Sequence, residues 1–264
     1  MAFVRRWALS LLVAVAVAPA FAMTFALAGC GGPPAPAPTD TPTGPPADRD
    51  QLAGLAAAAK DKRYVATYTF AVAKRSDRTV TVAYGMDGSW VVGIPAGALG
   101  GLADVAVYSS AAGLFQCALG PAAGTAGTRP DLGPITAGCV KVDALGPTTD
   151  PRVQHLFTDW NAALRDRQNA LSVAAVPLLP GAVGACYSVE STSAALAPPV
   201  DPGVYCYRGD GLLTVAKVSF GTLTITGTVG AAPPSVTMPG PVVDRAPLPV
   251  TAPPAPTITP LPSR

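Results

Sequence analysis

Residues 79–94 read TVTVAYGMDGSWVVGI, and this stretch is the most direct indication of the class of fold. Apolar and β-branched residues alternate on both sides of Asp87-Gly88, a dipeptide that favours tight hairpin turns because both positions accept positive φ. A two-residue turn would place Tyr84 opposite Val91. One face of the predicted hairpin would then hold Thr81, Ala83, Trp90, Val92 and Ile94.

The same alternation recurs along the chain and predicts further strands at 64–72, 104–109, 114–119, 204–207, 212–218 and 222–228. A second hairpin signal, Asp210-Gly211, lies between two of them. Helical signals occur twice. Asp50 precedes a short helix from Gln51 to about Lys60, and Asp150-Pro151 begins a longer helix over 151–169. We therefore predict an α+β fold, with a curved antiparallel sheet (an incomplete β-barrel) packed on a few helices.

Proline-rich segments flank this pattern and divide the chain. We predict a disordered spacer over 30–49, a folded domain over 50–230 and a Pro-rich tail over 231–264. Proline lacks the N–H that helices and central strands need, which favours an extended tail, with Val242-Val243 as the part that would lie along the domain. An inert solvated tail is favoured over a partner-binding arm.

Residues 1–29 have the features of a lipoprotein signal peptide. Arg5 and Arg6 precede an uncharged apolar run that ends in Leu27-Ala28-Gly29-Cys30, the pattern that the lipoprotein signal peptidase cleaves. Two alternatives stay open. The run is long enough to be an uncleaved membrane anchor, and Ala20-Phe21-Ala22 resembles an ordinary cleavage site. The favoured interpretation places lipidated Cys30, and with it the protein, at the outer face of the cytoplasmic membrane.

Five cysteines are an awkward number for an exported protein, but lipidation of Cys30 leaves an even set. The remaining four allow three pairings. We predict Cys117–Cys139 and Cys186–Cys206, because each pair lies in neighbouring β-like segments joined by a connection rich in Gly, Pro, Ser or Thr. The other pairings would have to join the two halves of the domain across the 151–169 helix.

Composition and motifs argue against several classes of function. The chain carries 18 basic and 16 acidic residues, and loss of Arg5 and Arg6 with the signal would leave it neutral. Such a chain has no electrostatic footprint for nucleic acid. His155 is the only histidine, and a general base needs a nucleophile and an orienting partner. Asp159 and Asp166 are interpreted as exposed solubilising charges. No phosphate-binding loop or G-x-S-x-G motif occurs, so we predict no enzyme, metal or cofactor.

The order of elements resembles the LolA-like class of actinobacterial lipoproteins, a class similar to the carriers LolA and LolB and to the LppX and LprG lipoproteins. The resemblance covers roughly residues 50–230, and it rests on the lipobox, the spacer, the short helix, the strand at 64–72, and the hairpins at 86–90 and 203–211. It implies an incomplete barrel closed by helices over a cavity for lipid or acyl chains. The two cysteine pairs depart from those carriers and predict a cavity that is stapled shut or absent.

The leading hypothesis is a membrane-anchored lipoprotein that binds a lipid or another hydrophobic ligand. The side chains expected to line its site are Trp90, Phe157, Trp160 and Leu164. The alternative is an interaction or sensor lipoprotein with a packed core, which would present its surface or its tail to an envelope protein.

Overall fold

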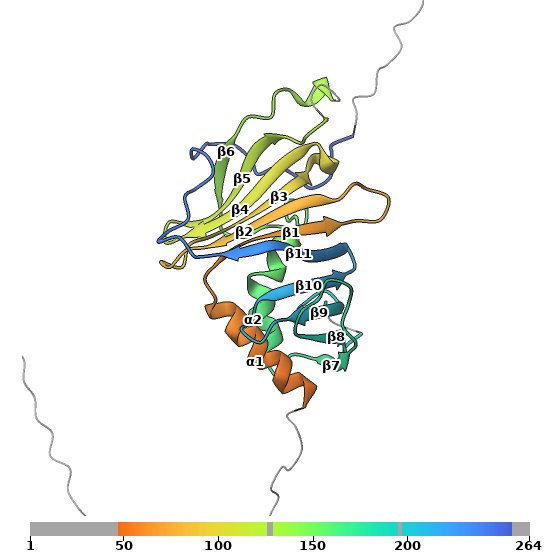
Figure 1. Cartoon of the computed structure of the whole chain (residues 1–264). Coiled ribbons are helices and arrows are strands. Elements are labelled where there is room, and N and C mark those ends of the chain that lie inside the picture. Colours follow the sequence, from red (N-terminus) through yellow and green to blue (C-terminus); the bar gives the residue numbers. More distant parts are fainter. Residues whose placement is uncertain (1–46, 126–128, 195–196, 255–264) are drawn as a thin grey trace, which may run out of the picture. The chain divides into compact units, whose positions relative to one another are not determined.

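The computed structural model describes residues 47–125, 129–194 and 197–254. They form one sheet of 11 antiparallel strands in the order β6-β5-β4-β3-β2-β1-β11-β10-β9-β8-β7 (Figure 1). The predicted α+β class, with a curved antiparallel sheet that does not close, is confirmed. The predicted signal peptide, Cys30 and the spacer up to residue 46 lie outside the described residues.

Two meanders build the sheet, one from each half of the chain. The first contains β1 (Val65–Ala71), β2 (Arg78–Tyr84), β3 (Trp90–Ala98), β4 (Ala103–Ser110), β5 (Gly113–Pro121) and β6 (Gly138–Val142). The second contains β7 (Leu171–Val176), β8 (Ala185–Ser191), β9 (Gly203–Tyr207), β10 (Leu213–Val218) and β11 (Gly221–Gly230). The last strand pairs with β1, so the chain's first and last strands join the two meanders.

The helices pack on one face of this sheet, which we call the inner face. They are α1 (Asp48–Asp61) and α2 (Asp159–Arg165), with short 3-10 turns η1 (Leu99–Gly101), η2 (Pro130–Leu132) and η3 (Val153–Leu156). Alternate strand residues such as Tyr68, Val82 and Val107 bury against Leu52 of α1 and Leu164 of α2. None of the helices in the described part of the chain is long and apolar enough to span a membrane.

The predicted register of the first hairpin is wrong by one residue. Tyr84 pairs with Trp90 rather than Val91, so Trp90 lies on the inner face beside Val82 and Tyr84 instead of beside Thr81 and Ala83. Of the two residues Asp87 and Gly88, only Gly88 has a positive φ, of 86°. The loop between β2 and β3 runs from Gly85 to Ser89. The Asp87 carboxylate accepts hydrogen bonds from the Ser89 backbone N and Oγ. These side-chain bonds stabilise a wider loop than the two-residue turn.

Both predicted helices differ from the observed ones. The first begins at Asp48, three residues earlier than predicted, and its N-cap is Ala47 with no side-chain cap. The predicted helix over 151–169 is wrong, because η3 and α2 are separate and Arg152 has a left-handed φ of 67°. Asp150 does not cap an α-helix. Its carboxylate accepts hydrogen bonds from side chains of the following turn, as described below.

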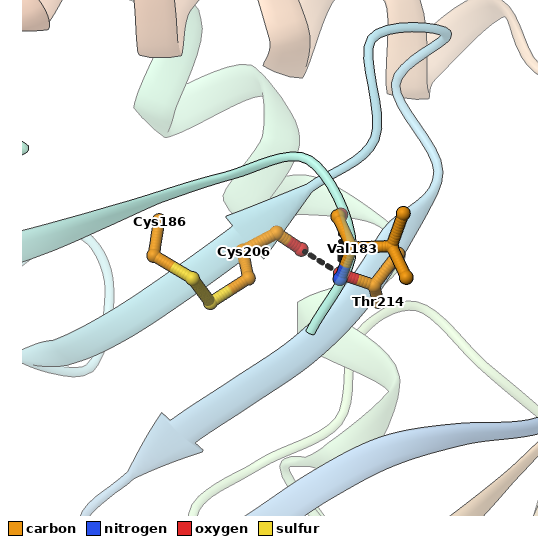
Figure 2. Close-up of a disulfide and its surroundings, with 4 residues drawn as sticks. All are labelled: Val183, Cys186, Cys206 and Thr214. Atoms are coloured by element: carbon orange, nitrogen blue, oxygen red, sulfur yellow. Dashed lines mark hydrogen bonds between the residues drawn. A yellow bond between two sulfur atoms is a disulfide. The ribbon is translucent and has the colours of Figure 1, made fainter. Parts of the chain in front are cut away.

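The four cysteines form the two predicted disulfides, Cys117–Cys139 and Cys186–Cys206. Each bond joins directly paired residues of neighbouring strands, β5 with β6 and β8 with β9. Both lie on the outer face in small apolar clusters. In Figure 2, Thr214 lies between Cys206 and Val183, and its hydroxyl is 3.1 and 3.0 Å from their carbonyl oxygens. The loop at Val183 is thereby held over the second disulfide.

Residues 231–254, here called the strap, dock on the sheet. The prediction that the Val242 region lies along the domain is confirmed, because Val242 pairs in parallel with Cys139 at the β6 edge. The prediction of a solvated tail is wrong for these residues. Val236 is 7% exposed and packs in the outer cluster around Cys117–Cys139. The strap then reaches the inner side, where Leu248 exchanges two hydrogen bonds with the Gln116 side chain.

The prolines of the strap explain both the wrong prediction of a solvated tail and the way in which the strap binds to the sheet. A proline has no N–H, but its carbonyl oxygen remains an acceptor. Four prolines of the strap use that acceptor, at distances of 2.7 to 3.1 Å from backbone N atoms of the domain. They are Pro233 with Met86, Pro234 with Asp87, Pro241 with Cys139, and Pro249 with Leu99.

Candidate functional site

An open groove lies on both sides of Trp90, where β3 begins. On one side it has a volume of about 310 Å³, an apolar floor and a polar rim. Its floor includes Val107 of β4, Leu114 of β5 and Leu145 after β6. On the other side a hollow of about 250 Å³ is lined by Trp90 with Lys60, Arg63, Tyr84, Gly88, Phe157 and Thr158. We call the two together the Trp90 groove.

Trp90 is positioned by the register of β3. It pairs with Tyr84 of β2 and Ser109 of β4, and its ring lies 6.3 Å from the Tyr84 ring. The Tyr84 hydroxyl donates a 2.6 Å hydrogen bond to the Phe157 carbonyl. Burial raises the pKa of Tyr84 far above its usual range, so this donor stays protonated. The segment between η3 and α2 is thereby held against the groove.

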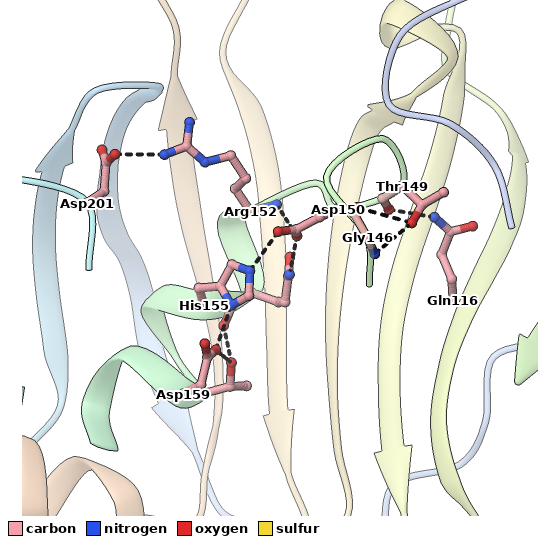
Figure 3. A network of polar contacts seen from close by, with 10 residues as sticks. Gln116, Gly146, Thr149, Asp150, Arg152, His155, Asp159 and Asp201 are labelled. Atoms are coloured by element: carbon pink, nitrogen blue, oxygen red, sulfur yellow. Dashed lines mark hydrogen bonds and ion pairs between the residues drawn. The ribbon is translucent and has the colours of Figure 1, made fainter. Parts of the chain in front are cut away.

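His155 forms part of the groove's rim and is held by two carboxylates (Figure 3). Its Nε2 lies 2.8 Å from Asp150 Oδ2 and its Nδ1 lies 2.6 Å from Asp159 Oδ1. The ring stacks on Trp160, with centroids 5.5 Å apart. Burial lowers the pKa of His155, but the hydrogen bonds to Asp150 and Asp159 outweigh burial and raise it to about 9. The imidazole is therefore a cation at neutral pH.

This network holds the chain between β6 and α2 in place. Asp150 also accepts hydrogen bonds from Arg152 N, at 2.8 Å, and Gln154 Nε2, at 2.6 Å. Asp159, predicted to be only a solubilising charge, is thus a structural partner of His155. A protonated imidazole bound by two carboxylates is a poor general base, and none of the ring's contacts is a serine or cysteine nucleophile. The arrangement favours a structural role.

The raised pKa of His155 predicts a loss of stability in alkali. In the unfolded chain the pKa of His155 has its ordinary value of 6.5. The stabilisation of the folded state by the protonated ring is therefore complete below that pH and is lost as pH rises through about 9. Because Asp159 is 63% exposed, we expect solvent to reduce the effect to about 1–2 kcal/mol. Urea unfolding between pH 6.5 and 9.5 measures this, with His155→Gln as control. An equal slope in the variant would contradict the prediction.

Of the residues predicted to line a ligand site, the structure brings two to the groove. Trp90 lies at its centre and Phe157 lines the smaller hollow. Leu164 is fully buried in the core, and Trp160 is 8% exposed behind His155. Sequence reasoning missed Val107, Leu114 and Leu145, which come from three separate segments. Strand alternation could have placed the first two on the inner face, but nothing local indicated that they meet Trp90.

Nothing in residues 47–125, 129–194 and 197–254 indicates a metal centre, since no group of three or more His, Cys, Asp or Glu side chains comes together there. No protein-family model, no curated protein and no solved structure matches this chain. The groove and its chemistry are therefore the basis for a functional proposal.

Proposed function

We propose that the chain is an exported lipoprotein, anchored through Cys30 at the outer face of the cytoplasmic membrane, that binds the apolar part of a lipid in the Trp90 groove. The observation that carries the proposal is the groove itself. The Trp90 indole, Leu114 and Leu145 are partly exposed and line the opening, over Val107, which is fully buried. Binding sites for small ligands are concave and mostly apolar, with a few polar groups that orient the ligand.

The charges around the groove favour an anionic headgroup. Lys60 and Arg63 line the hollow beside Tyr84. Neither cation forms an ion pair within the described part of the chain. On the opposite rim Asp150 and Asp159 together outweigh the charge of His155, and Asp143 adds a further carboxylate, so this rim carries net negative charge. An amphiphile would therefore place its anionic group at Lys60 and Arg63 and its chain along Trp90.

The size of the groove limits what it holds. A volume of about 310 Å³ is at the lower end of ligand sites, which span roughly 300–1,000 Å³. The core between sheet and helices is filled, with Tyr68, Tyr205 and Leu223 all at 0% exposure. The wide cavity implied by the resemblance to the carriers is thus closed at these side chains. One acyl chain segment fits the groove better than a lipid with several buried chains.

The anchor is tested by fatty-acid labelling in the producing cell. The label should appear on Cys30 and be absent from Cys30→Ala, which should accumulate as precursor or be shed. A variant that stays membrane-bound and correctly processed would show that the lipobox interpretation is wrong.

Trp90→Ala should weaken binding of dodecanoate about tenfold or more. Loss of a buried aromatic contact costs about 1.5–3 kcal/mol, and 1.4 kcal/mol is a factor of ten in affinity. Calorimetric titration of the mature chain measures this. Met86→Ala is the matched control, because Met86 is 67% exposed in the same hairpin. Replacing Lys60 and Arg63 by Gln should remove the preference for dodecanoate over dodecanol.

Mass spectrometry of lipids extracted from the natively purified protein identifies the occupant. We expect an anionic lipid in the wild type and its loss from Trp90→Ala. Equal dodecanoate affinity in Trp90→Ala and Met86→Ala, together with ligand-free protein from its own membrane, would overturn the proposal.

A further inference from the structure

A second hollow lies at the other end of β3, where the strand finishes at Ala98. Its outer part has a volume of about 460 Å³ and its inner part about 250 Å³, and both are lined by Arg75, Arg78 and Gly101. Six segments far apart in the sequence meet there, namely residues 70–78, 94–104, 122–123, 151–153, 220 and 250–251. We call it the arginine pocket.

The backbone around the arginine pocket is strained. The described residues include four non-glycine residues with positive φ, and all four lie in segments that form or adjoin this pocket: Lys74, Ala96, Leu99 and Arg152. Left-handed backbone costs such residues about 1–2 kcal/mol each. Strain of this kind persists only where surrounding contacts hold it, and it concentrates at functional sites.

Specific contacts hold the strained segment. Residues 95–97 bulge out of the pairing between β3 and β4, so that three residues stand opposite Asp104. The Asp104 carboxylate accepts a 2.7 Å hydrogen bond from Ala96 N. The strap adds two more, from Leu99 N and Gly100 N to the carbonyl oxygens of Pro249 and Val250. The pocket wall is thus built by side chains and backbone from distant parts of the chain.

The two arginines of the pocket are incompletely neutralised. Arg78 Nη1 donates to the carbonyl oxygens of Pro95 and Ala96, and its guanidinium lies 4.9 Å from the Phe70 ring centroid. Its Nε is buried with no hydrogen-bond partner in the described structure. Burial lowers the pKa of Arg78, and the neighbouring charge of Arg75 lowers it further. Arg75 forms no ion pair with any described residue.

Acidic groups line only the outer part of the pocket. Asp77 and Asp104 line this outer part, and the Asp104 carboxylate accepts the hydrogen bond from Ala96 N. The inner part is lined by Arg75 and Arg78 with Phe70, Val153 and Phe220, among other apolar residues, and by no carboxylate. Arg152 stacks 4.6 Å from the Phe220 ring centroid and is paired with Asp201 at 2.7 Å. The inner part therefore combines aromatic surface with two arginines, neither of which forms an ion pair with a described residue.

We propose that the arginine pocket binds an oxyanion, a carboxylate or a phosphate, carried on a small apolar group. The oxyanion lies between Arg75 and Arg78, and the apolar group lies against Phe70 and Phe220. Guanidinium groups bind both oxyanions through paired, charge-assisted hydrogen bonds. The site is independent of the Trp90 groove, because the two lie at opposite ends of β3.

Calorimetry at low salt tests the proposal with octanoate, octyl phosphate, inorganic phosphate and octanol as probes. We expect octanoate and octyl phosphate to bind and octanol not to bind, and the tighter of the two anions identifies the oxyanion. Arg75→Gln should weaken both at least tenfold. Asp77→Asn should strengthen both about two- to threefold, because it removes a like charge from the rim.

Arg165→Gln is the matched control, since it removes an exposed arginine from the last turn of α2. All of these titrations are made on Trp90→Ala chains, so that binding in the proposed lipid groove is already weakened and the measured affinity reports on the arginine pocket. Equal weakening in Arg75→Gln and Arg165→Gln, or no binding of any anion at low salt, would overturn the proposal. Equal affinity for inorganic phosphate and octyl phosphate would show that no apolar group of the ligand binds against Phe70 and Phe220.

Discussion

Truncation after Gly230 should destabilise the folded domain by about 3 kcal/mol or more and lower the melting temperature by roughly 6–12 °C. The strap covers apolar surface on the outer face, where Val236 packs with Tyr108 and Phe115. It also supplies hydrogen-bond partners to the Gln116 side chain, which is 2% exposed. The amide of Gln116 donates to the carbonyl oxygen of Leu248 and accepts from its backbone N. A buried polar group without its partner costs about 1–3 kcal/mol.

Truncation after Pro254 is the control, because it removes only residues outside the described part. Differential scanning calorimetry of the two truncated chains gives the comparison. Val236→Asp should reproduce much of the loss, since it places a charge in the outer cluster. If the chain ending at Gly230 had the same melting temperature as the control chain ending at Pro254, the strap would contribute nothing to stability.

Replacing Cys117 and Cys139 by alanine should cost about 3 kcal/mol, and replacing Cys186 and Cys206 should cost about the same. The bonds close loops of similar length, with sequence separations of 22 and 20. In the chain-entropy model the effect grows only slowly with loop length, so the two variants should be nearly equal. Denaturant unfolding of each double variant measures the difference.

The strap should also control which disulfide is reduced first. All four cysteines are at most 2% exposed, and the strap covers only the Cys117–Cys139 cluster. In the chain truncated after Gly230, dithiothreitol should reduce that bond before Cys186–Cys206, as followed by alkylation and peptide mapping. Equal reduction rates would show that the strap does not protect the bond. A peptide joining Cys117 to Cys186 or Cys206 would contradict the pairing itself.

These experiments bear on the alternative of a protein-binding lipoprotein. A partner that used the docked face of residues 231–254 would have to displace hydrogen bonds to Met86, Cys139 and Gln116. We therefore expect envelope crosslinks that depend on the tail to map to residues 255–264 or to follow release of the strap. Crosslinks to Val236 in the fully folded chain would require a partner that binds over the outer cluster.

Local signals in the sequence were sufficient for eight of the eleven strands and for the disulfides, but β7 was not predicted, and β6 and β8 were indicated only as β-like segments around their cysteines. Alternation of apolar residues placed most strands within a few residues, and Asp210-Gly211 marked a real hairpin, with Arg208 N donating to Leu212 O. The cysteine pairs followed because their partners lie in strands that are neighbours along the chain. Such features depend on hydrogen bonds and periodicity within a short segment, which the sequence displays directly.

The tertiary structure alone decided the hairpin register, the broken helix, the strap and the groove. Met86 N and Asp87 N donate hydrogen bonds to Pro233 and Pro234 of the strap, which hold the wider loop in which Trp90 lies opposite Tyr84. His155 is held between Asp150 and Asp159, which favours η3 and α2 over one continuous helix. In each case the deciding contact is a hydrogen bond made by a side chain or a carbonyl oxygen. Each of these groups could form hydrogen bonds with several different partners. Only the packed fold selects one of them, because burial makes every unmade hydrogen bond costly.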